Sequence, residues 1–234
     1  MRINRYIATM GVCSRRHADR LIEAGRVTVN GETARLGQKI KDGDRISIDG
    51  KPLRGDIARE RVVLAYHKPA GILCTSNRSR PNNIIDAVRY PRRVFTVGRL
   101  DQDSRGLILL TDDGELAYHL TRTREGHEKE YVVTVDRPFD DAFLAAMTSG
   151  VDILETTTLP CDIRPVGPET FRIVLTQGLN RQIRRMCDAL GYTVIDLMRV
   201  RFANIRLGDL PEGVWRELTD EERDELDRRI GRTP

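Results

Sequence analysis

The 234-residue chain contains few lysines, few cysteines and no long hydrophobic segment. No run of 18 apolar residues is present, so the sequence predicts no membrane-spanning helix. Its start alternates charged and apolar side chains and lacks the apolar core of a secretory signal, so we expect a cytoplasmic protein. The cysteines form no CxxC pair, which argues against a zinc knuckle and against a disulfide framework. They are Cys13, Cys74, Cys161 and Cys187.

Motifs for nucleotide cofactors and catalytic metals are also missing from the sequence. It contains neither GxGxxG nor a Walker loop. Residues 101–106 resemble the start of a calcium loop, but Arg105 stands at the fifth position, where an oxygen ligand is needed. Residues 127–131 begin like the zinc motif HExxH but end in Tyr131. We therefore expect neither a metal nor a cofactor.

The basic charge is carried mainly by arginine and is unevenly distributed. The chain has 34 Arg and 5 Lys, with a net charge of +4. The planar guanidinium suits phosphates and bases, which favours a nucleic-acid partner, although a lineage bias toward arginine would leave the same count. Residues 1–60 carry a net charge of +5, and residues 61–216 carry +2. Seven acidic residues follow between Glu217 and Asp227.

Residues 1–31 have the pattern of two short helices followed by a hairpin. Apolar residues between Ile3 and Met10 have helical spacing. Ser14 is a candidate N-cap for a second helix over residues 15–24. Residues 26–31 end in Asn-Gly and predict a strand that enters a hairpin turn.

The arginine-rich helices of this segment suit contact with a phosphate backbone. A DNA-reading helix-turn-helix is the competing interpretation, but the hairpin and the end of the pattern near residue 60 fit it less well. The segment resembles the S-four-type RNA-binding domain, which implies binding of structured RNA. The matching positions are residues 2–7, Gly11 and residues 14–19, 21–22, 25–31 and 43–44. The arginines expected to contact RNA are Arg2, Arg5, Arg15, Arg16 and Arg26.

We expect a domain boundary near residue 60, with an RNA-binding domain over residues 1–60 and a second domain over residues 61–234. Residues 51–56 contain turn-forming residues without periodicity and are interpreted as a linker. Near the other end, Thr219 precedes a cluster of acids and predicts an acidic helix over about 219–231.

Three elements of the second domain are candidates for chemistry. Asp101 follows a strand in a Gly-Arg-Leu-Asp loop, where a turn-forming role is the alternative. Asp101 and Asp103 would point to opposite sides of an extended segment, which argues against a glycosidase pair. Tyr131 lies in an alternating strand, where a core position is the alternative.

The third element is a strand, a glycine turn and a helix over residues 171–190. We expect Asn180 to cap the helix. Arg181, Arg184 and Arg185 would then lie in its first turn, where the helix dipole is already positive. A bound anion, such as a phosphate or a carboxylate, would offset the repulsion between these arginines and the positive end of the helix dipole.

Together these blocks resemble the Rsu/Rlu family of bacterial rRNA pseudouridine synthases. The loop sequences are more similar to the F-type large-subunit branch of this family than to its small-subunit branch. The matching blocks are Lys68-Pro69-Ala70-Gly71, Gly98-Arg99-Leu100-Asp101 with the residues up to Leu116, Lys129-Glu130-Tyr131, and Gln177 to Cys187. They occur in the same order as in the family, C-terminal to the expected RNA-binding domain.

The resemblance implies an α+β protein whose catalytic domain has a mixed, mainly antiparallel sheet with a central active-site cleft. It implies isomerisation of a uridine in structured RNA, most simply in 23S rRNA, without a cofactor. A small-subunit rRNA or tRNA synthase is an alternative, as is a non-catalytic RNA-binding assembly factor. We expect a monomer.

The same resemblance assigns roles to individual residues. Asp101 is implied as the essential carboxylate, Arg184 as its partner and Tyr131 as the aromatic that stacks on the uracil. Arg99 matches the residue that fills the gap left by the flipped base. Lys68 is expected to contact RNA or to position a loop. Arg181 and Arg185 are further expected RNA contacts.

Overall fold

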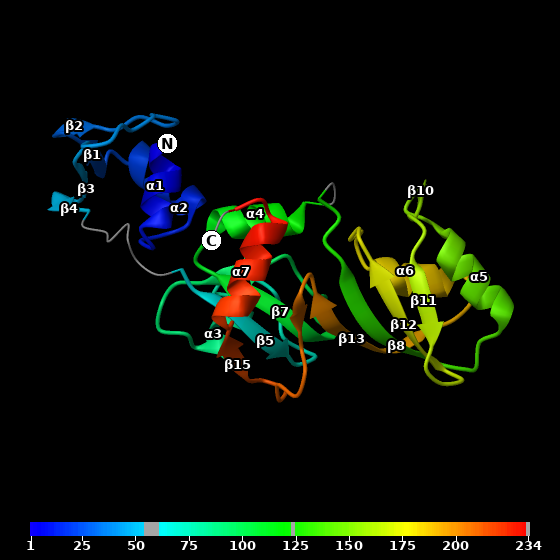
Figure 1. Ribbon diagram of the computed structural model, residues 1–234. Helices are drawn as coiled ribbons and strands as arrows, with labels where there is room; N and C mark the ends of the chain where they lie inside the picture. Colours follow the sequence, from blue (N-terminus) through cyan, green and yellow to red (C-terminus); the bar gives the residue numbers. More distant parts are fainter. Residues whose placement is uncertain (54–60, 123–124, 233–234) are drawn as a thin grey trace. The chain divides into compact units, whose positions relative to one another are not determined.

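The computed structural model describes residues 1–53, 61–122 and 125–232. It divides into two compact units, Met1–Arg61 and Val62–Pro234. The first is a small unit of helices and sheet, and the second is built on a mixed, mainly antiparallel sheet (Figure 1). The expected α+β class is therefore confirmed.

The N-terminal unit places two helices against a four-stranded sheet. Helices α1 (Ile3–Thr9) and α2 (Arg15–Glu23) precede strands β1 (Val27–Val29), β2 (Glu32–Thr33), β3 (Ile46–Ile48) and β4 (Lys51–Pro52), in the order β2-β1-β3-β4. Ser14 caps α2 through a hydrogen bond from the His17 N–H, as predicted. Asn30 and Gly31 both have positive φ, as a two-residue hairpin requires. Lys51 and Pro52, interpreted as linker, instead pair with β3.

The main sheet of the second unit has the strand order β11-β12-β8-β13-β7-β5-β15. Among the paired strands that the structure describes in this unit, only β13 and β7 run parallel. Two short strands extend the sheet, β14 beside β13 and β6 beside β7. The strands are β5 (Val63–Lys68), β6 (Phe95–Val97), β7 (Arg105–Thr111), β8 (Lys129–Val135), β11 (Asp162–Pro165), β12 (Thr170–Leu175), β13 (Val194–Phe202), β14 (Ile205–Arg206) and β15 (Trp215–Glu217). A separate hairpin joins β9 (Asp152–Ile153) and β10 (Thr156–Thr157).

Helices cover different parts of this sheet (Figure 1). Helices α5 (Asp141–Ser149) and α6 (Gln182–Ala189) pack on the core formed with β8 and β12. Helices α4 (Gly114–Thr121) and α7 (Asp220–Arg229) pack against Leu107 and Leu109 of β7. Helix α3 (Ile84–Val88) packs in one core cluster with Ile108 and Leu110, which lie on the other face of β7. Strand β7 is therefore buried on both faces and gives the neighbouring loops a rigid support.

The two helix starts predicted in the second unit have different outcomes. Thr219 and Glu222 form a capping box at α7, as the Thr219 prediction required. Asn180 was the wrong cap for α6, because Arg181 takes that position in a left-handed conformation. Among the described residues, no helix is long and apolar enough to cross a membrane.

Candidate active site

Asp101 lies in the loop between β6 and β7, on the wall of an open cavity. Gly98 enters this loop with a φ of 72°, a conformation that favours glycine. Leu100 is buried against a core cluster, whereas Asp101 is partly exposed. The cavity has a volume of about 660 Å³ and is lined by Ala70, Gly71, Asp101, Gln102, Asp103 and Arg181. The expectation that Asp101 and Asp103 face opposite sides of an extended segment was wrong, because Gln102 and Asp103 form a turn and both aspartates line the same cavity.

Lys68 joins two loops of this cavity from inside the protein. Its side chain is fully buried, and Nζ donates hydrogen bonds to the carbonyl oxygens of Pro69, Ile72 and Gln102 at 2.7, 2.9 and 3.3 Å. Gly71 donates its N–H to the Gln102 carbonyl at 2.7 Å, and Gln102 Nε2 returns a hydrogen bond to Gly71 at 3.1 Å. Burial lowers the pKa of Lys68, although nearby acidic groups oppose this shift. The expected RNA contact is wrong for this buried residue, and its bonds are those of a loop-positioning residue.

Asp103 binds two of the arginines predicted for the site. Its carboxylate oxygens accept hydrogen bonds from the two Nη atoms of Arg181 at 3.1 and 3.0 Å. Arg184 Nε lies 3.4 Å from Asp103 Oδ2, and its Nη2 donates to the Asp103 carbonyl at 3.1 Å. Burial raises the pKa of Asp103, but Arg181 and Arg184 outweigh it and hold that pKa below its ordinary value. Asp103 is therefore an ionised group at the centre of the arginines.

Arg184 does not pair with Asp101 in this structure. Among the described residues, no ion pair joins the two, and the remaining hydrogen bond of Arg184 goes from Nη1 to the Val194 carbonyl at 3.0 Å. The predicted pairing is thus replaced by one with Asp103. Asp101 nevertheless acts on the neighbouring cation, since both Asp103 and Asp101 raise the pKa of Arg181.

The start of α6 explains where its arginines point. Arg181 has φ 50° and ψ 36°, and Gln182 Oε1 accepts the Leu179 N–H at 3.0 Å, so that the chain turns before the helix begins. Arg185 donates from Nε to the Asn180 carbonyl at 3.1 Å and from Nη2 to Asn180 Oδ1 at 3.3 Å. Arg181 thereby reaches the cavity, while Arg185 is held by its own loop.

Tyr131 lies on the core face of β8 and packs against two clusters of buried residues. One cluster contains the core beneath α5 and α6, and the other contains Leu100 beside Asp101. In register, Tyr131 is opposite Arg199 of β13, and Arg199 is opposite Gly106 of β7. One row of the sheet thus connects Tyr131 with the end of the Asp101 loop. Tyr131 is not among the residues that line the cavity.

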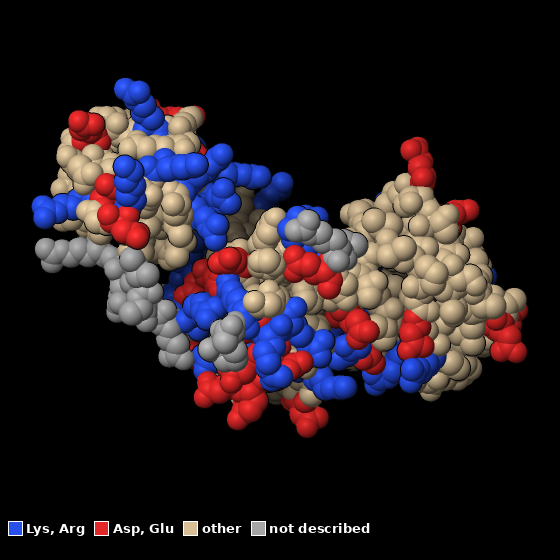
Figure 2. Space-filling model, turned by 45° about the horizontal axis from the view of Figure 1, so that its top comes forward, with Lys and Arg blue, Asp and Glu red and all other residues tan. Residues whose placement is uncertain are grey.

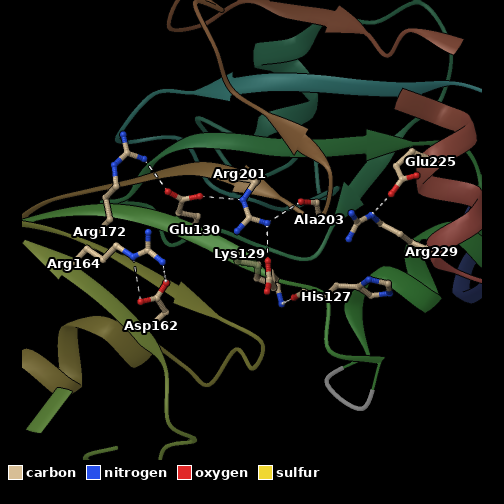
Figure 3. A network of polar contacts seen from close by, with 11 residues as sticks. His127, Lys129, Glu130, Asp162, Arg164, Arg172, Arg201, Ala203, Glu225 and Arg229 are labelled. Carbon is tan, nitrogen blue, oxygen red and sulfur yellow. Dashed lines mark hydrogen bonds and ion pairs between the residues drawn. The ribbon is translucent and has the colours of Figure 1, made fainter. Parts of the chain in front are cut away.

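The residues beside Tyr131 anchor the strand on both sides. Glu130 accepts hydrogen bonds from Arg172 at 2.8 Å and from Arg201 at 3.0 Å, as Figure 3 shows. Lys129 Nζ donates to the His127 carbonyl at 3.1 Å. Burial, followed by the charge of Arg199, lowers the pKa of Lys129 to about 8. These contacts hold β8 in a register that keeps Tyr131 on the core face.

Two positions near the site were missed from the sequence, Gly106 and Arg199. Gly106 has a φ of 104°, and a Cβ there would come within 2.3 Å of the Arg199 carbonyl oxygen. Arg199 is only 2% exposed, and its Nε donates to the Leu107 carbonyl at 2.6 Å. Gly106 lies inside β7 in the structure, and a glycine within a strand is a sign of close backbone approach. No local pattern marks a buried arginine. Arg99, by contrast, is exposed on the Asp101 loop.

The arginines predicted in the N-terminal unit differ in their availability. Arg2, Arg5, Arg15 and Arg16 are exposed, and Figure 2 shows basic side chains gathered on part of this unit's surface. Arg26 instead binds Asp49 through two hydrogen bonds at 2.8 and 2.6 Å. The pairing and charge of Asp49 raise the pKa of Arg26. The Arg26 guanidinium is therefore already bound by a carboxylate.

The structure thus combines a small unit of helices and a hairpin that carries exposed arginines with a second unit whose open cavity is lined by carboxylates and an arginine, groups suited to chemistry on an anionic substrate. Residues 62–189 match the RNA pseudouridylate synthase family, and residues 1–46 match the S4 domain. The chain belongs to the RNA pseudouridylate synthase family. It is a pseudouridine synthase, an isomerase, with an N-terminal S4 domain, and the family predicted from the sequence is confirmed.

Known relatives support the same assignment over almost the whole chain. The chain is 47% identical to the dual-specificity RNA pseudouridine synthase RluF of Escherichia coli (strain K12) over 222 residues, which cover 95% of this chain and 77% of the relative. It is 39% identical to the ribosomal large subunit pseudouridine synthase B of Shigella flexneri, with 93% and 79% covered. A solved pseudouridylate synthase structure is 30% identical with a TM-score of 0.71, and 97% of this chain and 99% of that chain are covered.

Proposed function

We propose that the enzyme isomerises a uridine of large-subunit rRNA, with Asp101 as the essential carboxylate. The observation that carries this proposal is the cavity of about 660 Å³ with Asp101 on its wall and Arg181 beside it. An open cavity of this kind admits a flipped nucleotide, and a guanidinium suits the phosphate that accompanies it. The relatives named for large-subunit rRNA and for dual specificity support the choice of RNA.

The reaction breaks the bond between the ribose and N1 of uracil, turns the base and joins C5 to the sugar. C5 then loses its proton and N1 gains one, so the isomerisation is redox-neutral overall and needs no oxidant or reductant. The protein supplies acid, base, nucleophilic and positioning groups. Asp101 attacks the sugar or removes its 2′ proton, and either role requires the ionised form. Arg181 lines the same cavity and offers a guanidinium for a phosphate of the substrate.

Tyr131 and Arg99 act on the flipped base and on the space that it leaves. Tyr131 stacks on the uracil, an interaction worth about 1–3 kcal/mol per base. Tyr131 is partly buried and stands outside the cavity lining, so this role requires the base to pass the residues that line the cavity. Arg99 is exposed on the same loop as Asp101 and fills the gap in the RNA stack.

A second RNA class is favoured by a specific observation. The relative that matches 95% of the chain is named for dual specificity. We therefore include tRNA as a second candidate substrate. Ribosomal RNA and tRNA as substrates place the enzyme in the cytoplasm.

The experiment incubates the protein with unmodified transcripts of 23S rRNA, 16S rRNA and tRNA and maps pseudouridine in each. We expect new pseudouridine at one or a few sites of 23S rRNA, and in tRNA if the second candidate holds. The Asp101→Asn variant provides the inactive control. Pseudouridine confined to 16S rRNA would contradict the large-subunit proposal, and none in any transcript would contradict the proposed function as a whole.

A further inference from the structure

We propose that Asp103 is a positioning residue that holds Arg181 in the RNA-free enzyme, and that a phosphodiester of the substrate takes the place of the Asp103 carboxylate on Arg181. This inference rests on the proposed function, because it concerns RNA bound in the same cavity. It assigns to Asp103 the role of holding the Arg181 guanidinium in place until the substrate binds.

The first argument is the geometry of the pair. Both Nη atoms of Arg181 donate to the two carboxylate oxygens of Asp103, at 3.1 and 3.0 Å. A carboxylate and a phosphate accept such a guanidinium fork in the same two-point manner. Asp103 therefore stands where a phosphate would stand.

The second argument is the access of the pair to solvent. Asp103 and Arg181 both line the cavity, and their side chains are 48% and 41% exposed. An exposed ion pair contributes little to stability, so an incoming anion can displace it. Arg184 differs, since its side chain is 11% exposed and is tied to the Val194 and Asp103 carbonyls. Arg184 is a fixed cation, whereas Arg181 is the exchangeable one.

The third argument is the backbone of Arg181. Its φ of 50° is unusual for a residue with a side chain, and no side chain caps the helix at this position. Such a conformation persists only where the surrounding structure holds it, and it is enriched at functional sites. Here the conformation aims the guanidinium across the turn at the Asp101 loop, where it meets Asp103.

The experiment measures the equilibrium binding of an unmodified 23S rRNA transcript by the whole chain at several KCl concentrations. All variants are made in an Asp101→Asn background, so that the RNA is not converted. Asp103→Asn should lower Kd about fivefold, because a competitor for Arg181 is removed. Arg181→Gln should raise Kd about tenfold and reduce the salt slope by about one, the loss of one phosphate contact.

The double variant provides the decisive comparison. With Arg181→Gln already present, Asp103→Asn should change Kd less than twofold, since the cation that Asp103 occupied is gone. Asp162→Asn is the matched control, because it removes a carboxylate from an exposed pair with Arg164 and changes the net charge equally. It should leave Kd within twofold.

The inference is overturned if Asp103→Asn leaves Kd unchanged or raises it, or if it tightens binding equally in the Arg181→Gln background. The proposed function is scored separately, by pseudouridine formation with the wild-type chain on the same transcript. A transcript that is bound but not converted contradicts the proposed function, and the binding comparison still decides the role of Asp103.

Discussion

Around Asp101, neighbouring carboxylates have different surroundings and therefore different tasks. Asp103 is saturated by Arg181 and Arg184, whereas no ion pair of Asp101 is present among the described residues. A carboxylate that is not already bound by a guanidinium keeps its oxygens available for a sugar or a proton. Asp101 is therefore the better placed of the two for chemistry, and Asp103 for controlling the cations.

We expect Asp101→Asn to abolish pseudouridine formation while leaving RNA affinity within about tenfold of wild type. The substitution keeps the shape of the side chain but removes the charge and the basic oxygens that either role requires. Single-turnover assays on a 23S rRNA transcript would measure the rate, and filter binding would measure the affinity. Asp162→Asn serves as the control and should retain activity. Turnover near the wild-type rate in Asp101→Asn would show that another group performs the reaction.

At the scale of helices and strands, α4 depends on a charged contact at its start. Asp113 caps this helix by accepting the N–H groups of Glu115 and Leu116, and it also pairs with Arg232 at 2.6 Å. Burial raises the pKa of Asp113, but the hydrogen bonds and the charge of Arg232 outweigh it and lower that pKa from 3.8 to about 2. The Asp113 side chain is only 9% exposed, so solvent screens this contact weakly.

This shift predicts a pH-dependent stability. A carboxylate whose folded pKa is depressed stabilises the protein above pH 3.8, and the stabilisation disappears as the pH falls toward 2. We expect Asp113→Asn to lower the free energy of unfolding at pH 7 by about 2 kcal/mol, with the difference from wild type vanishing near pH 2. Asparagine also caps helices, so the comparison isolates the charge. Urea unfolding between pH 2 and 7 measures the difference in the free energy of unfolding between wild type and Asp113→Asn. A difference that does not depend on pH would contradict the prediction.

Local rules predicted those elements whose cause is local. Ser14 and Thr219 were identified as caps because each lies within three residues of the N–H group that it accepts. The start of α6 was misplaced, because Arg181 has a left-handed backbone at that position, and its side chain pairs with Asp103, 78 residues earlier in the chain. The burial of Lys68 likewise depends on the Gln102 loop. Family motifs indicated which residues belong to the site, but only packing determines which of them touch.

At the scale of the whole molecule, the net charge of +4 conceals a division of roles. The N-terminal unit carries exposed arginines and no candidate for chemistry, whereas the second unit holds the cavity. Arginines of this chain also serve structure, as Arg232 does at α4 and Arg216 does with Glu222. An excess of arginine therefore indicates RNA binding only where the side chains are exposed and not already bound by acids.

We therefore expect the double variant Arg15→Gln with Arg16→Gln, in the whole chain, to weaken binding of a 23S rRNA transcript about tenfold. Each exposed arginine that contacts a phosphate contributes about one to the salt slope, so the slope should fall by about two. The rate of pseudouridine formation at saturating RNA should stay near wild type, because the catalytic residues lie in the other unit. Arg26→Gln is the matched control, and its effect should be smaller because Asp49 already binds that guanidinium. Binding and salt slope that stay at wild-type values in the double variant would show that this face of the S4 domain does not hold the RNA.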